Sequence, residues 1–137
     1  MLSEPIASLI RAEQARQGGR FVNGVDLEVY LTKLGQRAEI LSDAGEGRCR
    51  GFIAFYANDR ATRQAYITSV LVDPRDRGLG IGRALVACAL DLAKRRGFTS
   101  CRLEVSRDNA VAHAMYRALG FRVIDGHTDR DLMEIAL

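Results

Sequence analysis

The spacing of apolar residues predicts a definite order of helices and strands. Apolar positions recur at helical spacing in two N-terminal segments, residues 4–16 and 26–37, with Asp26 as a candidate N-cap of the second. Alternating or continuous apolar runs then predict three strands, a helix, a strand, a helix and two closing strands. The expected ranges are, in order, Ala38–Ser42, Arg50–Tyr56, Ala65–Val72, Gly80–Arg96, Cys101–Val105, Asn109–Leu119, Phe121–Asp125 and Leu132–Leu137.

The connections between these segments indicate the fold class. Residues 43–47 and 58–60 are polar and are typical of hairpin turns, and Pro74 ends the strand before it. Helices alternate with strands in the second half, which predicts an α/β (α+β layered) fold with a mixed central sheet flanked by helices. The β-α-β unit at residues 65–105 should place two parallel strands side by side. No linker divides the chain, so residues 1–137 are expected to form a single domain.

A glycine-spaced loop after Val72 carries the clearest chemical signal. It reads Asp73-Pro74-Arg75-Asp76-Arg77-Gly78-Leu79-Gly80-Ile81-Gly82-Arg83 and leads directly into a predicted helix. Glycines let the backbone approach a ligand, and a helix N-terminus favours an anion; the three arginines add positive charge. No Lys-Ser/Thr follows, as a P-loop needs, and the dinucleotide spacing fails as well. The loop is therefore either a phosphate or pyrophosphate site of another kind or a flexible turn that binds nothing.

The wider pattern resembles a known family. Arg77-x-x-Gly80-x-Gly82, after a strand and before a long helix, is similar to motif A of the GCN5-related N-acetyltransferase (GNAT) family. The family's later signals follow in order as Leu103-Glu104-Val105, Asn109, Tyr116 and Gly120-Phe121. The resemblance covers about residues 50–137. The family usually begins with a strand before its first two helices, and the sequence leaves open whether residues 1–10 form it.

The resemblance implies where acetyl-CoA binds. The cofactor should lie between the strand ending at Val72 and the strand ending at Val105, with its pantetheine arm along the main chain of Val70, Leu71 and Val72. A backbone N–H of Leu71 or Val72 would stabilise the oxyanion of the reaction. Asn109 should anchor the cofactor. The pyrophosphate would accept hydrogen bonds from the amides of Arg77, Gly78, Leu79, Gly80, Ile81, Gly82 and Arg83.

Two catalytic residues are expected. Tyr116 lies seven residues after Asn109, so both share a helix face, and its phenol can protonate the departing thiolate. The alternative is a half-buried tyrosine that packs on Phe121. Glu104 resembles the general base of the family branch that acetylates protein N-termini. It could instead be an ordinary exposed carboxylate, and Tyr66, Glu39 and a water chain are competing bases.

Composition removes several other function classes. The 20 Lys and Arg residues are spread along the chain against 17 acidic residues, and there is no Trp, so a nucleic-acid partner is not expected. The longest uncharged apolar run, Ala84–Leu90, is far too short to span a membrane, and no secretory signal is recognisable; we expect a cytoplasmic protein. Three cysteines without C-x-x-C spacing indicate no metal site, and Cys88 and Cys101 are expected to be packing residues. His113 and His127 lack a triad partner and are expected to be solvated or packed.

The implied function is direct transfer of the acetyl group of acetyl-CoA to a primary amine: a small-molecule amine, an amino sugar or a peptide N-terminus. A non-catalytic acyl-CoA-binding regulatory module is the alternative, and a general nucleotide-phosphate module is a third hypothesis. Residues 17–26 and 125–131 should flank the acceptor, and Asp125, Asp129 and Asp131 would suit a cationic amine. The edge of the terminal hairpin could support a homodimer.

Overall fold

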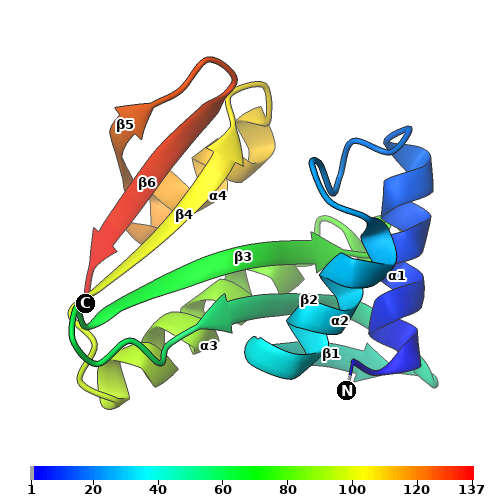
Figure 1. The fold of residues 1–137 in the computed structure, drawn as a ribbon, viewed down its shortest axis with the longest axis horizontal. Coiled ribbons are helices and arrows are strands. Elements are labelled where there is room, and N and C mark those ends of the chain that lie inside the picture. The colour runs from blue at the N-terminus through cyan, green and yellow to red at the C-terminus, as the bar shows by residue number, and fades with distance from the viewer. Residues whose placement is uncertain (1) are drawn as a thin grey trace.

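A mixed six-stranded sheet forms the centre of the computed structural model, which describes residues 2–137 (Figure 1). The strands lie in the order β1-β2-β3-β4-β6-β5. β3 and β4 pair in parallel, and the other neighbours pair antiparallel. The bounds are β1 (Glu39–Gly45), β2 (Arg48–Tyr56), β3 (Gln64–Val72), β4 (Ser100–Ser106), β5 (Arg122–Gly126) and β6 (Arg130–Ala136). The mixed sheet and its parallel pair confirm the predicted fold class.

Helices cover both faces of this sheet. α1 (Glu4–Arg16) and α2 (Leu27–Arg37) pack on one face, and α3 (Ile81–Arg95) and α4 (Ala110–Leu119) pack on the other (Figure 1). The carboxylate of Asp26 accepts the N–H groups of Glu28 and Val29 at 2.9 and 3.2 Å, so the predicted N-cap of α2 is confirmed. The predicted order of helices and strands is confirmed along the described chain, with one added 3-10 turn at Pro74–Asp76.

Strand β2 joins two hydrophobic cores. Its side chains alternate, so Phe52 and Ala54 contact the α1–α2 layer while Ile53 and Phe55 contact the α3–α4 layer. All four side chains are at most 1% exposed. A strand buried on both faces requires the continuous apolar run that the sequence has here.

A bulge in β3 changes which residues face each layer. Ala54 lies opposite Ser69 and Phe55 opposite Ile67, so Thr68 is an extra residue in this register. One extra residue reverses the alternation of side chains. Ile67 accordingly belongs to the α3–α4 core, while Leu71 belongs to the α1–α2 core.

Three details of the sequence prediction need correction or completion. Cys88 is exposed and not a packing residue, whereas Cys101 is buried as expected. The turn expected at residues 43–47 is confined to Glu46 and Gly47, because β1 continues to Gly45. Residues 2–10 contain no strand, since α1 already begins at Glu4; Met1 lies outside the described residues.

The packing of α3 explains the error at Cys88. The buried residues Ile81, Leu85, Ala89 and Ala93 recur every four positions and form the stripe that meets the sheet. Cys88 is one position, about 100° of helical rotation, away from Ala89. It therefore points to solvent although its neighbours in the sequence are apolar.

Two glycines at the start of α3 serve different needs. Gly80 is the N-cap residue and has a φ of 81°, and a Cβ there would meet nothing within 4 Å. Gly82 is helical, and a Cβ there would lie 3.5 Å from Val72 and 3.6 Å from Met115. Gly80 is thus required by its backbone conformation, whereas Gly82 has room for a methyl group.

We predict opposite effects of an alanine at these two positions. Gly80→Ala should lower the free energy of unfolding by about 1–2 kcal/mol, because an L-residue in the left-handed region is strained. Gly82→Ala should leave stability unchanged or raise it by up to about 1 kcal/mol, because alanine favours the helix. Urea unfolding of both variants measures the difference, and equal stabilities would contradict the assignment.

Candidate active site

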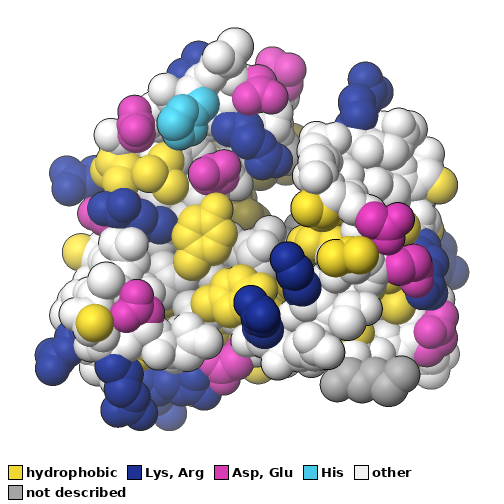
Figure 2. Space-filling model, in the orientation of Figure 1, with side chains coloured by type: hydrophobic (Ala, Val, Ile, Leu, Met, Phe, Trp, Pro, Cys, Tyr) yellow, Lys and Arg dark blue, Asp and Glu magenta, His cyan; other side chains and the backbone are white. Residues whose placement is uncertain are grey.

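The site begins where β3 and β4 separate. Their parallel pairing covers only Gln64–Ile67 and Ser100–Leu103, although β3 continues to Val72 and β4 to Ser106. Beyond Ile67, β3 pairs only with β2, and β4 pairs only with β6. The two strands diverge in Figure 1, and the space-filling view is hollowed between the two halves of the molecule (Figure 2). The predicted residues Val70, Leu71 and Val72 therefore line one side of this opening with an edge unpaired toward β4.

The loop after β3 ends in a row of amides without partners. None of the backbone N–H groups of residues 78–83 donates a hydrogen bond within the described chain, and the first bonded amide is that of Ala84, to Gly80 at 3.0 Å. Unpaired N–H groups at a helix N-terminus, together with the helix dipole, attract anions. We call residues 78–83 the amide cradle. It contains six of the seven residues predicted to bind the pyrophosphate.

The arginines near the amide cradle are less available than the sequence indicates. Arg75 binds the carboxylate of Asp73 at 2.9 and 3.2 Å. Arg77 donates to the carbonyl oxygen of Val72 at 3.2 Å and lies 3.5 Å from Glu13. Of the three arginines, only Arg83 has no ion-pair partner in the described part of the chain.

Buried carboxylates fix the segment that precedes the amide cradle. Arg75 donates to Asp73 through its side chain and its backbone, and these bonds lower the pKa of Asp73 to about 2. Arg48 of β2 reaches Asp76 at 2.6 Å and Asp73 at 3.5 Å. Its hydrogen bond also lowers the pKa of Asp76. Both aspartates are ionised near neutral pH, so these contacts hold the loop against β2.

Tyr116 of α4 lies in the α3–α4 core. Its side chain is 7% exposed and packs edge-to-face on Phe121, with ring centroids 5.6 Å apart. Burial, and to a smaller extent the neighbouring Cys101, raises the pKa of Tyr116 to about 12. Within the described chain its hydroxyl forms no hydrogen bond. The packing role on Phe121 is therefore real, and the phenol also remains a protonated and unengaged donor.

Helix α4 connects Tyr116 with the amide cradle. Met115, next to Tyr116, lies 3.6 Å from the Cβ position of Gly82. Asn109 caps α4, because its side-chain oxygen accepts the N–H of Ala112 at 3.1 Å. Its amide nitrogen remains free to donate to a ligand.

Glu104 is the first β4 residue beyond the pairing with β3. Its side chain is exposed and has no ion-pair partner in the described chain. Glu104 and Arg102 are two residues apart on β4, so their side chains lie on the same face of the sheet. Arg102 pairs with Tyr66 of β3, and Tyr66 pairs with Tyr56 of β2, so these tyrosines share that face. We call the face that carries Tyr56, Tyr66 and Glu104 the acceptor face.

The competing bases are differently placed. Burial raises the pKa of Tyr66, the charge of Glu104 raises it further, and Arg130 opposes the change. A tyrosine with a raised pKa is a weaker source of phenolate at neutral pH. Glu39 forms a bidentate ion pair with Arg96. Of the three side chains, Glu104 is the one that carries a free carboxylate beside the opening.

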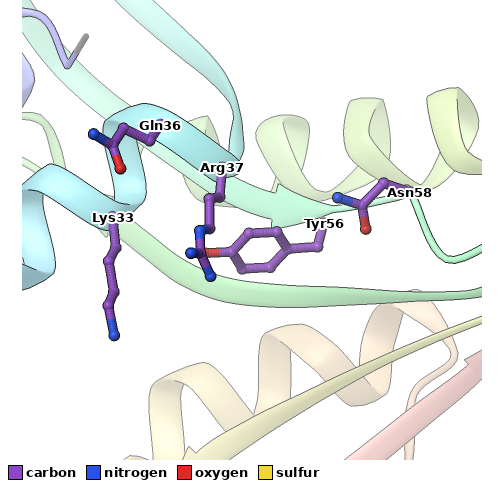
Figure 3. A pocket seen from close by; sticks show the side chains of 5 residues that line it. All are labelled: Lys33, Gln36, Arg37, Tyr56 and Asn58. Atoms are coloured by element: carbon purple, nitrogen blue, oxygen red, sulfur yellow. The ribbon is translucent and has the colours of Figure 1, made fainter.

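Several side chains that line the acceptor face were not recognised in the sequence. A cavity of about 630 Å³ is lined by Lys33, Gln36, Arg37, Tyr56 and Asn58 (Figure 3). Tyr30 lies one helical turn before Lys33 and packs, partly buried, against the α1–α2 core. Burial raises the pKa of Tyr30, and the hydroxyl groups of Thr68 and Ser69 oppose that rise. The spacing of Tyr30, Lys33 and Arg37 along α2 was the available signal.

The polar groups of the site suit a long ligand with a phosphate at one end. They offer an anion cradle at the start of α3 and a free strand edge on β3, and α4, which contacts α3, carries a protonated phenol. No cluster of three or more potential metal-binding side chains occurs in the described residues. None of the described helices is long and apolar enough to span a membrane.

Comparisons with known proteins agree with this geometry. Residues 16–121 match the model of the acetyltransferase (GNAT) family. A mycothiol acetyltransferase of Beutenbergia cavernae is 35% identical over 88 residues, which cover 64% of this chain and 29% of that protein. The [ribosomal protein bS18]-alanine N-acetyltransferase of Escherichia coli K12 is 37% identical over 68 residues, which cover 50% and 46%.

A solved structure supports the same fold over the whole chain. The PaiA N-acetyltransferase of Thermoplasma acidophilum, in complex with coenzyme A, superposes with a TM-score of 0.69 at 24% identity, covering 100% of this chain and 81% of that one. The chain spans less than half the length of the two curated relatives named above. The family match extends over most of the chain, including the amide cradle and Tyr116. The protein therefore belongs to the GNAT acetyltransferase family.

Proposed function

We propose that this chain is an acetyl-CoA-dependent N-acetyltransferase that passes the acetyl group directly to a primary amine. The observation that carries the proposal is the amide cradle at the open end of β3, together with the buried phenol of Tyr116 on α4, whose neighbour Met115 lies 3.6 Å from the Cβ position of Gly82. The family match and the coenzyme A complex of the PaiA enzyme support it. The acceptor is a small-molecule amine, an amino sugar or a peptide N-terminus, and residues 1–137 act as one domain.

The residues of the opening divide the binding of acetyl-CoA between them. The amide cradle and Arg83 hold the pyrophosphate, with Arg77 placed at its start by Val72 and Glu13. The free edge of Val70, Leu71 and Val72 pairs with the pantetheine arm, and Asn109 donates its side-chain N–H. Acetyl-CoA supplies an activated thioester. Amides already fixed in place lose little freedom when the ligand binds, which favours tight binding.

Proton transfer is assigned to two side chains on opposite sides of the opening. Tyr116 donates its phenolic proton to the departing sulfur and can do so across the neutral range because its pKa lies near 12. Glu104 accepts the proton of the attacking amine, directly or through water. Its free carboxylate on the acceptor face is the basis of this role.

The remaining assignments are also proposals. β5 is the outer strand of the sheet and all of its residues are exposed, so its free edge is the site for a homodimer contact. We propose a cytoplasmic enzyme with no metal, nucleic-acid or membrane partner. The spread of basic residues and the lack of a long apolar run support this.

A coupled test separates the proposed enzyme from its alternatives. The protein should bind coenzyme A in calorimetry and release free thiol from acetyl-CoA when a panel of amines and peptides is added, with a mass increase in the acceptor. Binding without thiol release for every acceptor would favour the non-catalytic module. If ATP or NAD displaced coenzyme A as well as desulfo-CoA does, a general phosphate-binding module would be favoured.

Tyr116→Phe should lower kcat by about 10²–10⁴-fold, because it removes the proton donor. Coenzyme A affinity should stay unchanged, because the ring and its contact with Phe121 remain. Since the pKa of Tyr116 lies near 12, ionisation of this residue should not reduce the wild-type rate below about pH 10. An unchanged kcat in the variant would contradict the assignment.

Glu104→Gln should lower the acceptor kcat/KM and remove the rise of the rate with pH that a carboxylate base produces. The side chain is exposed, so the variant should fold as the wild type does. Glu134→Gln is a matched control, because Glu134 lies on the same sheet but is bound to Arg102 at 2.7 Å. A Glu104→Gln enzyme with the wild-type pH–rate profile would eliminate this base.

A further inference from the structure

The cavity lined by Lys33, Gln36, Arg37, Tyr56 and Asn58 is rich in hydrogen-bond donors and carries two positive charges. We call it the cationic pocket. Lys33 and Arg37 leave α2 on the same side, and Arg37 and Tyr56 line the same cavity (Figure 3). Lys and Arg side chains also gather over α2 beside the hollow of the molecule (Figure 2).

No carboxylate of the described chain neutralises this pair of charges. Neither Lys33 nor Arg37 forms an ion pair within the described residues. The carboxylate nearest in sequence, Glu39, is engaged by Arg96. Like charges four residues apart on a helix destabilise it by a few tenths of a kcal/mol. An anionic ligand between them would remove that repulsion.

The cationic pocket opens beside the acceptor face. Tyr56, one of its lining residues, pairs with Tyr66 on β3, and the phenol of Tyr66 lies close enough to Glu104 to feel its charge. Neighbouring paired strands lie about 4.8 Å apart, so β2 and β4 are separated by about 10 Å where Tyr56, Tyr66 and Arg102 pair, and Glu104 lies just past the last β3–β4 pair. A single small molecule can therefore place one end at Glu104 and the other between Lys33 and Arg37.

One aspartate of the acidic segment expected to bind a cationic acceptor is already engaged. Asp131 is bound by Arg107 at 2.9 Å and lies 3.5 Å from His113. Its charge is thus already compensated, whereas the charges of the cationic pocket are not. Glu104 is the free carboxylate on the acceptor face, and the uncompensated positive charges beside that face are those of Lys33 and Arg37.

We propose that the cationic pocket binds an anionic group of the acceptor, so the substrate class is a primary amine that also carries a carboxylate or a phosphate. This inference rests on the proposed acetyltransferase function. Lys33 and Arg37 contact the anion, and the amine lies toward Glu104. Lys33 and Arg37 determine the specificity for the acceptor and take no part in proton transfer.

The test compares acceptors that differ only in the anion. The pairs are ω-amino carboxylates of increasing length with the matching n-alkylamines, O-phosphoethanolamine with ethanolamine, and alanyl peptides with Glu or Gln at the second and third positions. At the best length, kcat/KM should favour the anionic member by about tenfold or more, an effect of 1.4 kcal/mol. The carboxylate and phosphate pairs separate the two anions.

Variants then locate the anion site. Lys33→Gln and Arg37→Gln should each raise KM for the anionic acceptor about five- to tenfold with little change in kcat or in KM for acetyl-CoA. The double variant should lose the preference, and Arg37→Lys should retain it. Lys94→Gln, on the exposed surface of α3, is the control and should keep the wild-type preference. All of these side chains are exposed, so the variants should fold.

Each outcome separates this inference from the proposed function. Transfer to amines with no preference for the anion, or a preference that survives the double variant, overturns the inference and leaves the acetyltransferase intact. A folded protein that binds coenzyme A but acetylates none of the amines or peptides overturns the proposed function, and this inference with it. A preference that disappears in the double variant and persists in Lys94→Gln supports both.

Discussion

The end of the parallel pairing between β3 and β4, after Ile67 and Leu103, organises the rest of the site. Each strand is held from its outer side, β3 by β2 and β4 by β6. Their inner edges are therefore free to separate, and their polar backbone groups need water or a ligand as partners. α3 begins near the end of β3, and Glu104 is the first β4 residue past the last pair. One interruption of a sheet thus brings an anion cradle, a strand edge and a carboxylate to one opening.

The charges near the amide cradle mainly hold the protein in shape. Arg48 and Arg75 bind the carboxylates of Asp73 and Asp76, and Arg77 is drawn toward Val72 and Glu13. These arginines fix the loop before the ligand arrives, and the amides of residues 78–83 remain as the donors for an anion. Donors that are already oriented need no rearrangement when charge appears, which is the condition for strong electrostatic stabilisation in an enzyme.

The sequence predicts what local spacing determines. The order of elements, the N-cap at Asp26 and the glycine loop all depend on neighbours within one or two turns, and all were recognisable. The bulge at Thr68 has no such signature, and the partner of Arg77 lies 64 residues away at Glu13. Cys88 was wrongly predicted to be buried because α3 is apolar around much of its circumference. Only the contact with the sheet decides which stripe of the helix is buried.

The residues proposed to bind the cofactor and those of the cationic pocket lie in different structural surroundings. The residues proposed to bind the cofactor lie around the start of α3 and on α4, where Gly82 lies close to the side chains of Val72 and Met115. Residues of the cationic pocket are mostly exposed side chains of α2 and the end of β2, where substitutions cost little stability. Under the proposed function, such an arrangement would let acceptor choice change while the cofactor site stays constant. The glycine loop matches a recognisable pattern in the sequence, whereas Lys33 and Arg37 share only a spacing common to exposed helix faces, so the sequence predicts a cofactor loop but no acceptor.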